Sequence, residues 1–303
     1  MRKRNLIWRL YPQLSKYVNP PNGNLRINIA VENLLNVPIY FSKIEIYPSW
    51  ANAKKGVKLI QKNNYLSGGT PTSLTDFKLQ LPSKVGLYTL KFGLETWVYD
   101  NYRGSWKKLG VLQTSEWKYI QVTPQPIYDA FVSYSGRNDD SPIVNQILNL
   151  LRLWGFRPIL FGKDKFSEDP LKIPSDISRL IDRLPAVIGI ATPRDYSLQE
   201  KIFKTFPWFH IESAMAFKSD KPLLFIIDEA VKSEGFLEYP NFPKVFYNPA
   251  KIDVLEHRLA VVMPGFRERI AKKKTKSFLS GLGKAALITG GIWLVGKLSV
   301  KDS

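Results

Sequence analysis

Two uninterrupted apolar runs limit what this chain can fold into more than any other feature. Residues 185–191 read Pro-Ala-Val-Ile-Gly-Ile-Ala, and residues 222–227 read Pro-Leu-Leu-Phe-Ile-Ile. A strand with one solvent-exposed face alternates apolar and polar residues, whereas a strand that is buried on both faces is apolar at nearly every position. The two runs therefore predict central strands of a parallel sheet.

Strand-like and helix-like segments alternate around these runs. An apolar strand is expected over 128–133 and another over 156–161, with a helix that begins at Ser141-Pro142 between them. Ser175 is expected to cap a second helix, and a third is expected over about 207–218. This order predicts a flavodoxin-like α/β domain, a fold in which ligands bind beyond the carboxyl ends of the parallel strands.

The preceding stretch, 24–123, has the two-residue period of β-strands. Leu25, Ile27, Ile29 and Val31 alternate with polar residues, and similar strands are expected over 37–46, 86–94 and 117–122. The phase of 37–46 slips between Phe41 and Ile44, which predicts a β-bulge. Short alternating strands over this length predict an antiparallel β-sandwich of immunoglobulin-like type.

This β domain contains no recognisable catalytic constellation. Trp50, Trp97 and Trp106 are candidates for a binding face, although packing in cores and at sheet edges is the commoner role of such aromatics. Its function is therefore left open between a sensor, an adaptor and an oligomerisation module.

Composition and proline positions suggest the remaining boundaries. Residues 1–23 are expected to form a basic N-terminal segment. Residues 124–126 contain Pro124 and Pro126 and are expected to form a stiff linker. The α/β domain is expected over 127–264 and a basic, then apolar, tail over 265–303.

The 303-residue chain has no cysteine, two histidines and a formal net charge of +18. Thiolate zinc sites, disulfides and cysteine nucleophiles are thereby excluded, and a cytoplasmic location is expected. The charge would attract nucleic acid, anionic lipid or a dinucleotide, or it would serve only solubility. Because the basic residues cluster at the two ends of the chain, a nucleic-acid partner is not expected. Arg9 interrupts the first apolar residues, so no secretory signal is expected.

The tail combines a basic cluster at 267–276 with a mostly apolar stretch at 278–300. This stretch is a candidate membrane helix if Lys284 and Lys297 extend their ammonium groups to the interface. A helix that lies on a membrane surface or binds a partner fits the same residues.

Four motifs resemble the prokaryotic branch of TIR (Toll/interleukin-1 receptor) domains over about residues 127–250. The first is Ile-Tyr-Asp-Ala-Phe-Val-Ser-Tyr-Ser at 127–135, and the second is the loop at 162–174, which corresponds to the BB loop. The third is Trp208-x-x-x-Glu212, and the fourth is 221–229 followed by Gly-Phe-Leu at 235–237. Each motif is loose, but their order and spacing together are fairly specific.

The resemblance implies an NAD glycohydrolase or cyclase that releases nicotinamide, with Glu212 as the catalytic residue. NAD would be the substrate, and no permanently bound cofactor or metal is implied. It also implies a homo-oligomer formed through the TIR domain and a role as a defence or signalling effector. Lys163, Asp164, Lys165 and Phe166 of the loop would be gates or self-association contacts.

The residues themselves are suited to this chemistry. Trp208 and Glu212 are four apart and share one helix face, where a carboxylate can stabilise positive charge at an anomeric carbon and an aromatic ring can stack on a base. The cofactor-binding candidates at the end of the first strand, whose amides and guanidinium would hold phosphates, are Ser133, Tyr134, Ser135 and Arg137.

Plainer interpretations stay open. In the simplest alternative, Glu212 and Arg137 are solvent-exposed charged residues with no role in binding or catalysis. A TIR domain can also act as a non-enzymatic scaffold that signals by homotypic assembly. Dehydrogenase, NTPase and serine hydrolase readings are weak, because the sequence has no Gly-x-Gly-x-x-Gly, Walker or Gly-x-Ser-x-Gly motif.

Overall fold

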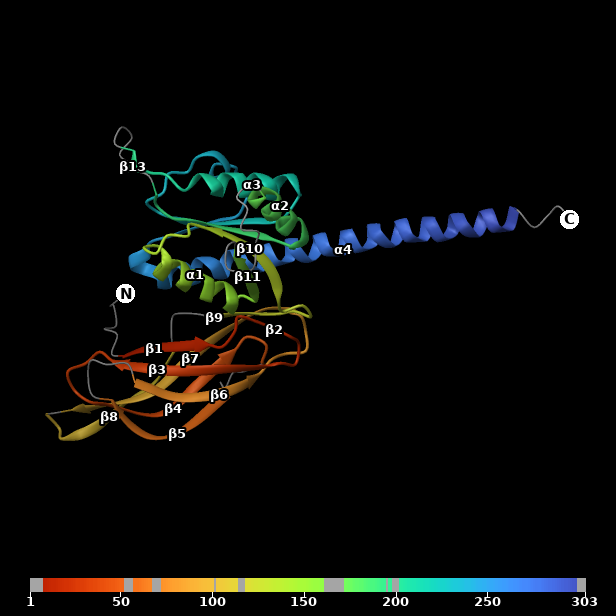
Figure 1. The fold of residues 1–303 in the computed structure, drawn as a ribbon. Helices are drawn as coiled ribbons and strands as arrows, with labels where there is room; N and C mark the ends of the chain where they lie inside the picture. The colour runs from red at the N-terminus through yellow and green to blue at the C-terminus, as the bar shows by residue number, and fades with distance from the viewer. Residues whose placement is uncertain are drawn as a thin grey trace. The chain divides into compact units, whose positions relative to one another are not determined.

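The computed structural model divides the chain into two compact units (Figure 1). One comprises Met1–Ile127 with Leu151–Phe156, and the other comprises Tyr128–Leu150 with Arg157–Ser303. The division at Ile127 lies next to the two prolines of the predicted linker 124–126. The structure describes residues 8–51, 57–66, 72–100, 102–113, 118–160, 172–194, 196–197 and 202–298.

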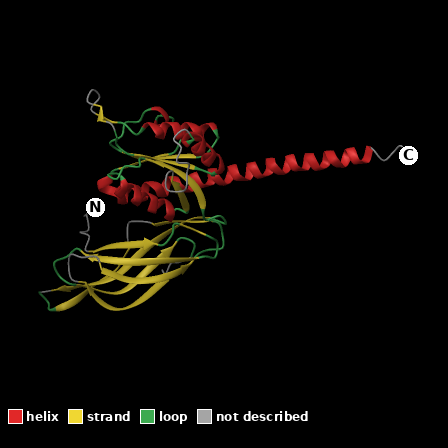
Figure 2. Cartoon of the chain, viewed as in Figure 1, coloured by secondary structure: helices red, strands yellow, loops and turns green. Residues whose placement is uncertain are grey.

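The first unit is built from β-strands, which Figure 2 shows in yellow. They are β1 (Trp8–Leu14), β2 (Val18–Asn19), β3 (Asn24–Asn33), β4 (Ile39–Pro48), β5 (Val57–Leu66), β6 (Thr72–Gln80), β7 (Gly86–Asp100), β8 (Ser105–Gln113) and β9 (Lys118–Val122). One sheet has the order β1-β3-β6, and the other has the order β2-β9-β7-β4-β5 with β8 on β7. Among the described strands of this unit the pairs are antiparallel apart from β2 with β9, which is parallel.

Alternating residues form the interior of this unit. Leu25, Ile27, Ile29 and Val31 of β3 have no exposed surface, and each such side chain contributes about 1.5–3 kcal/mol by leaving water. The register of β4 shifts between Phe41 and Lys43 against both neighbouring strands, which confirms the predicted bulge.

The first sheet begins earlier than the sequence suggested. Strand β1 lies inside 1–23, which was predicted as a basic segment outside the domain, and it pairs with β3 along its whole length. Trp8, Leu10 and Leu14 are buried on one side of it. Arg9 and Pro12 obscure this alternation in the sequence, and the strand escaped prediction for that reason.

The second unit alternates strands and helices, as the sequence predicted. Its elements are β10 (Tyr128–Tyr134), α1 (Ser141–Leu153), β11 (Phe156–Leu160), α2 (Ile173–Arg183), β12 (Val187–Ala191), β13 (Tyr196–Ser197), β14 (Ile202–Phe203), α3 (Pro207–Lys218), β15 (Leu223–Asp228), β16 (Lys244–Tyr247) and α4 (Ile252–Leu298). Two short 3-10 helices, η1 (Gly235–Leu237) and η2 (Pro249–Lys251), lie between β15 and α4. The main sheet has the order β11-β10-β12-β15-β16, and its strands from β10 to β16 pair in parallel.

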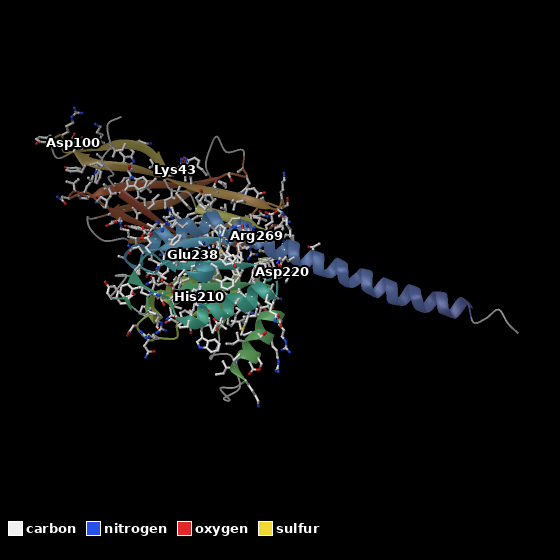
Figure 3. The ribbon with its side chains drawn as sticks, turned by 90° about the horizontal axis from the view of Figure 1, so that it is seen from above. Lys43, Asp100, His210, Asp220, Glu238 and Arg269 are labelled. Atoms are coloured by element: carbon white, nitrogen blue, oxygen red, sulfur yellow. The ribbon has the colours of Figure 1, made fainter. Side chains whose placement is uncertain are left out.

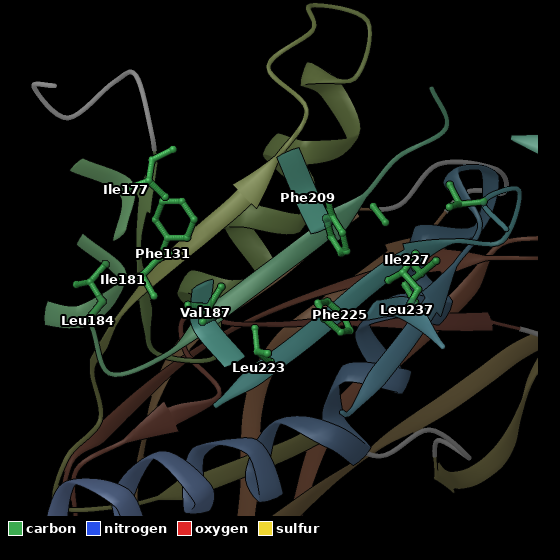
Figure 4. Packing of buried hydrophobic residues seen from close by; sticks show 13 residues of the cluster. Phe131, Ile177, Ile181, Leu184, Val187, Phe209, Leu223, Phe225, Ile227 and Leu237 are labelled. Carbon is green, nitrogen blue, oxygen red and sulfur yellow. The ribbon is translucent and has the colours of Figure 1, made fainter. Parts of the chain in front are cut away.

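Strands β12 and β15 are buried along their whole lengths, which confirms the prediction from the two apolar runs. Helices α2 and α3 cover one face of the sheet through a cluster that includes Phe131, Ile181, Phe209 and Phe225 (Figure 4). Helix α2 begins at Ile173, not at a Ser175 cap. The Ser175 hydroxyl instead donates to the Lys172 carbonyl at 2.8 Å.

Helix α4 overturns the predicted boundary at residue 264. It begins at Ile252 and continues past Pro264, and residues at helical spacing on both sides of this proline are buried: Leu255, Leu259, Met263, Phe266 and Ile270. Arg267, taken as part of a basic tail, is 2% exposed with its guanidinium 4.7 Å from the ring centroid of Tyr128. The α/β unit therefore extends at least to Ile270.

The candidate membrane helix, 278–300, falls largely on the end of α4, and its last residues lie outside the described part of the chain. Among the described residues, no helix combines the length and the apolar character that crossing a bilayer demands. Lys284 and Lys297, which had to be accommodated at the interface in the membrane interpretation, interrupt the apolar residues.

Candidate functional site

The candidate site lies where α3 crosses the carboxyl ends of β10 and β12. Helix α3 begins at Pro207, a residue suited to the first helical position because it has no N–H to leave unpaired. Its buried residues are Phe209, Glu212, Ser213 and Ala216, which follow the i, i+3, i+4, i+7 pattern of one helix face. Glu212 thus lies on the sheet-facing side of α3 and is 6% exposed.

A glycine of β12 allows α3 to approach the sheet this closely. A Cβ atom on Gly189 would lie 2.5 Å from Cε2 of Phe209, a separation that no side chain could occupy without moving the ring. Gly189 is also the Cα partner of Ser133 in β10. The same residue pair therefore sets the depth of α3 and places Ser133 beside it.

Burial raises the pKa of Glu212 from 4.5 to about 7. The Ser133 hydroxyl opposes this rise in part. Its interaction with the carboxylate is weaker than a full hydrogen bond, because Ser133 Oγ completes no hydrogen bond with the described residues. No lysine or arginine of the described chain forms a salt bridge with Glu212. The result is a buried carboxylate that changes its protonation near neutral pH.

A polar network continues from Ser133 along the strand end. The Ser135 hydroxyl donates to Oδ2 of Asp140, and the Thr192 hydroxyl donates to the same oxygen at 2.9 Å. The Arg194 guanidinium donates to Ser135 Oγ. Residues that follow β10 and β12 are thereby joined at the carboxyl edge of the sheet, where α/β folds bind ligands.

Several buried polar atoms near this edge lack hydrogen-bond partners among the described residues. They are Ser133 Oγ, Arg194 Nε, Thr205 Oγ1, His210 Nδ1 and Tyr247 OH. An unsatisfied buried polar group is costly, so a group of them in one region requires an explanation such as a missing ligand. His210, labelled in Figure 3, lies between Trp208 and Glu212 in α3, and burial lowers its pKa.

A buried aspartate and a buried tyrosine lie side by side at the ends of the neighbouring strands β15 and β16. Asp228 and Tyr247 are register partners in β15 and β16 and are both buried. Burial, with Glu229 and Asp140 nearby, raises the pKa of Asp228, and burial with the two aspartates raises that of Tyr247. Within the described chain, no group of three or more His, Asp and Glu residues is arranged to hold a metal ion.

The structure brings together only part of the predicted site. Ser133 is buried beside Glu212, Ser135 is buried in the network with Asp140 and Arg194, and Tyr134, between them in the sequence, is half-buried. Arg137 is exposed, and its backbone carbonyl accepts the Ser141 hydroxyl at 3.3 Å. Its guanidinium takes no part in the network, whose arginine is instead Arg194.

Trp208 was predicted to share one helix face with Glu212, but the two side chains differ in burial. It is 41% exposed, whereas Glu212 is buried. Lys163, Asp164, Lys165 and Phe166 lie outside the described residues. Sequence reasoning missed Asp140, Arg194 and Thr205, which belong to connecting segments and to no recognised motif.

Comparison with known proteins identifies no family. No family model and no curated protein matches the chain. Similar solved structures include a CARDB domain from Pyrococcus furiosus, 15% identical over 38% of this chain and 87% of that one, with a TM-score of 0.26. The CMP N-glycosidase BcmB of Clostridium botulinum is 15% identical over 42% of this chain and 98% of that one, with a TM-score of 0.29. At these values, neither likeness carries an argument about family or activity.

Proposed function

We propose that this chain is a TIR-type enzyme that cleaves NAD at the bond between nicotinamide and ribose. It would act as a defence or signalling effector that self-association activates. The observation that carries the proposal is Glu212, a buried carboxylate without a salt bridge among the described residues, at the carboxyl edge of a parallel sheet. Such a group is unfavourable for folding, so its presence needs a functional reason.

The chemistry follows from the charge of the transition state. As the bond to nicotinamide breaks, its electron pair leaves with the neutral pyridine ring, and positive charge develops at the anomeric carbon. The Glu212 carboxylate lies in a site from which water is largely excluded, where it stabilises that charge more strongly than it would in water. Attack by water gives ADP-ribose and a proton, whereas attack by the adenine ring gives the cyclic product.

The surroundings of Glu212 suit this role. With a pKa of about 7, about half of the carboxyl groups are ionised at neutral pH. The cationic nicotinamide ring of a bound NAD molecule would favour the ionised form further. The Ser133 hydroxyl and the Trp208 ring are available for a ribose hydroxyl and a planar ring.

The test is release of nicotinamide from NAD by purified protein at high concentration. We expect Glu212→Gln to lower the rate by at least about a thousandfold, because it removes the charge and keeps the shape. The variant's melting temperature is the control for folding. Equal rates for the wild type and Glu212→Gln would overturn the proposal.

One observation favours the alternative, a non-enzymatic scaffold that acts by homotypic assembly. Ile211 and Phe217 of α3 are 43% and 54% exposed, and Tyr239, whose ring centroid is 6.2 Å from that of Phe217, is 47% exposed. Exposed aliphatic and aromatic residues of this kind are typical of protein interfaces. Assembly that Phe217→Ser disrupts, together with no NAD turnover, would support the scaffold.

A further inference from the structure

Arg194 is held in place by hydrogen bonds and an aromatic ring. Its backbone N–H donates to the Lys204 carbonyl at 2.8 Å, its guanidinium donates to Ser135 Oγ, and its Cζ lies 5.9 Å from the ring centroid of Phe206. Among the described residues, no carboxylate forms a salt bridge with this guanidinium. A half-buried arginine oriented by three contacts but not neutralised is suited to an anion.

The unsatisfied atoms around Arg194 are mainly donors. Arg194 Nε can only donate, and the hydroxyls of Thr205 and Ser133 can donate. Thr205 and Ser133 are 4% and 3% exposed, so water does not readily satisfy them. Thr205 follows Lys204, the residue bonded to the Arg194 backbone, so these donors belong to one region. Donors without acceptors indicate a missing group that is rich in acceptor oxygens.

The amino-terminal end of α3 adds to this region. Phe206 is its N-cap residue and supplies no side-chain cap, and the first turn contains no acidic residue. The positive end of the helix dipole therefore meets no acidic side chain in this turn, as in many phosphate sites. Pro207 has no N–H, and the Phe209 N–H donates to the Phe206 carbonyl at 3.1 Å, so the dipole is what this helix end contributes. The strand-end turn leaves room, since a Cβ on Gly136 would meet no atom within 4 Å.

We propose that Arg194, Thr205 and the amino-terminal end of α3 bind a phosphate or diphosphate group. Assignment of this group to the diphosphate of NAD rests on the proposed function, but anion binding does not. Ser133, which interacts with Glu212, is two residues from Ser135, which accepts from Arg194, so one strand end links the two positions. The site replaces Arg137 as the expected phosphate ligand.

The test is binding of inorganic pyrophosphate and of ADP-ribose by calorimetry, with adenosine as the ligand without phosphate. Arg194→Gln should weaken both phosphate ligands by about tenfold or more. Thr205→Val should weaken them by about fivefold yet leave the melting temperature unchanged or higher, because it removes a buried hydroxyl that lacks a partner. Arg183→Gln, an exposed arginine in the last turn of α2, is the charge-matched control and should bind like the wild type.

The outcomes separate this site from the proposed enzyme. Pyrophosphate binding that depends on Arg194, without NAD cleavage, would leave the site and remove the glycohydrolase. NAD cleavage with an unchanged KM in Arg194→Gln would leave the enzyme and overturn the site. The site would also fall if pyrophosphate did not bind, if Arg183→Gln weakened it equally, or if Arg137→Gln alone abolished it. Thr205→Val with a lowered melting temperature and unchanged binding would mean that the hydroxyl is structural, which contradicts the site.

Discussion

Each unit of the molecule buries a glutamate, and the two are treated in opposite ways. Glu45 in β4 is 8% exposed, and its carboxylate accepts a hydrogen bond from the Tyr47 hydroxyl and forms a salt bridge with Lys43. Glu212 in α3 is 6% exposed, and within the described part of the chain it has only the weak interaction with Ser133. Equal burial with unequal partnership separates a carboxylate that serves the fold from one that is available for a ligand.

Asn33 of the first unit shows how completely a buried polar side chain can be partnered. The buried amide of Asn33 donates to the carbonyls of Val37 and Leu66 at 2.9 and 2.8 Å and accepts the Leu35 N–H at 2.9 Å. At the carboxyl edge of the α/β sheet, Ser133, Thr205 and Arg194 keep atoms without partners among the described residues. The first unit also has such atoms, at Trp8, Thr96, Trp97 and Gln121, so an unsatisfied atom alone does not mark a site. Those of the α/β unit differ because they accompany the buried carboxylate of Glu212, where a ligand would satisfy them.

The pH dependence of activity offers the largest test of this contrast. If the ionised form of Glu212 acts, kcat/KM should fall about tenfold for each pH unit below the carboxyl pKa of about 7. A glutamate with the ordinary pKa near 4.5 would give a flat profile between pH 5.5 and 7. A flat profile measured by initial nicotinamide release would therefore break the comparison.

Substitution of Glu212 should stabilise the protein at high pH. Its folded-state pKa is raised from 4.5 to about 7, so the folded state retains a proton that the unfolded state releases, and stability falls as the pH rises between these values. Glu212→Gln removes this cost, which amounts to about 3 kcal/mol above pH 7 and vanishes below pH 4.5. Chemical denaturation at pH 8 and pH 4 measures the difference. A variant less stable than the wild type at pH 8 would assign Glu212 to the fold.

Glu45→Gln should have the opposite sign. It removes the charge that Lys43 and Tyr47 share, and we expect the free energy of unfolding to fall by about 2 kcal/mol at neutral pH. Nicotinamide release per folded molecule should stay at the wild-type value. A neutral effect on stability would show that partners around a buried carboxylate do not report its role.

The smallest effect is expected at Ser133. Its hydroxyl lowers the pKa of Glu212 against the larger effect of burial, so Ser133→Ala should move the pH profile upward by less than about one unit. Ser213→Ala, on the same buried face of α3, is the matched control. A downward shift in Ser133→Ala would contradict the placement of its hydroxyl beside the carboxylate.

Local patterns predicted the parts of the molecule whose environment is uniform along an element. The runs at 185–191 and 222–227 became β12 and β15, and α3 has the predicted bounds of 207–218, because burial on both faces and proline at the first helical position leave direct marks. The alternation in β3 is equally direct.

The rest depended on contacts between distant segments. Arg194 lies in a loop and gains its role from Ser135 and Phe206, contacts that no spacing encodes. Arg267 was assigned to a solvated tail because it stands in a basic cluster, yet Tyr128 and the core-facing side of α4 bury it. A charged residue in the sequence does not predict solvent exposure when an aromatic ring from a distant segment packs over its charged group.

The burial of Arg267 against Tyr128 also sets the order of events during synthesis. Tyr128 opens the first strand of the α/β sheet, but the helix that covers it comes about 140 residues later. Strands β1–β9 all precede Tyr128 and can pair while the ribosome is still translating. The nascent chain must wait for Ile270 to emerge before the α/β unit closes, so the candidate site would be completed well after the strands of the first unit have been made.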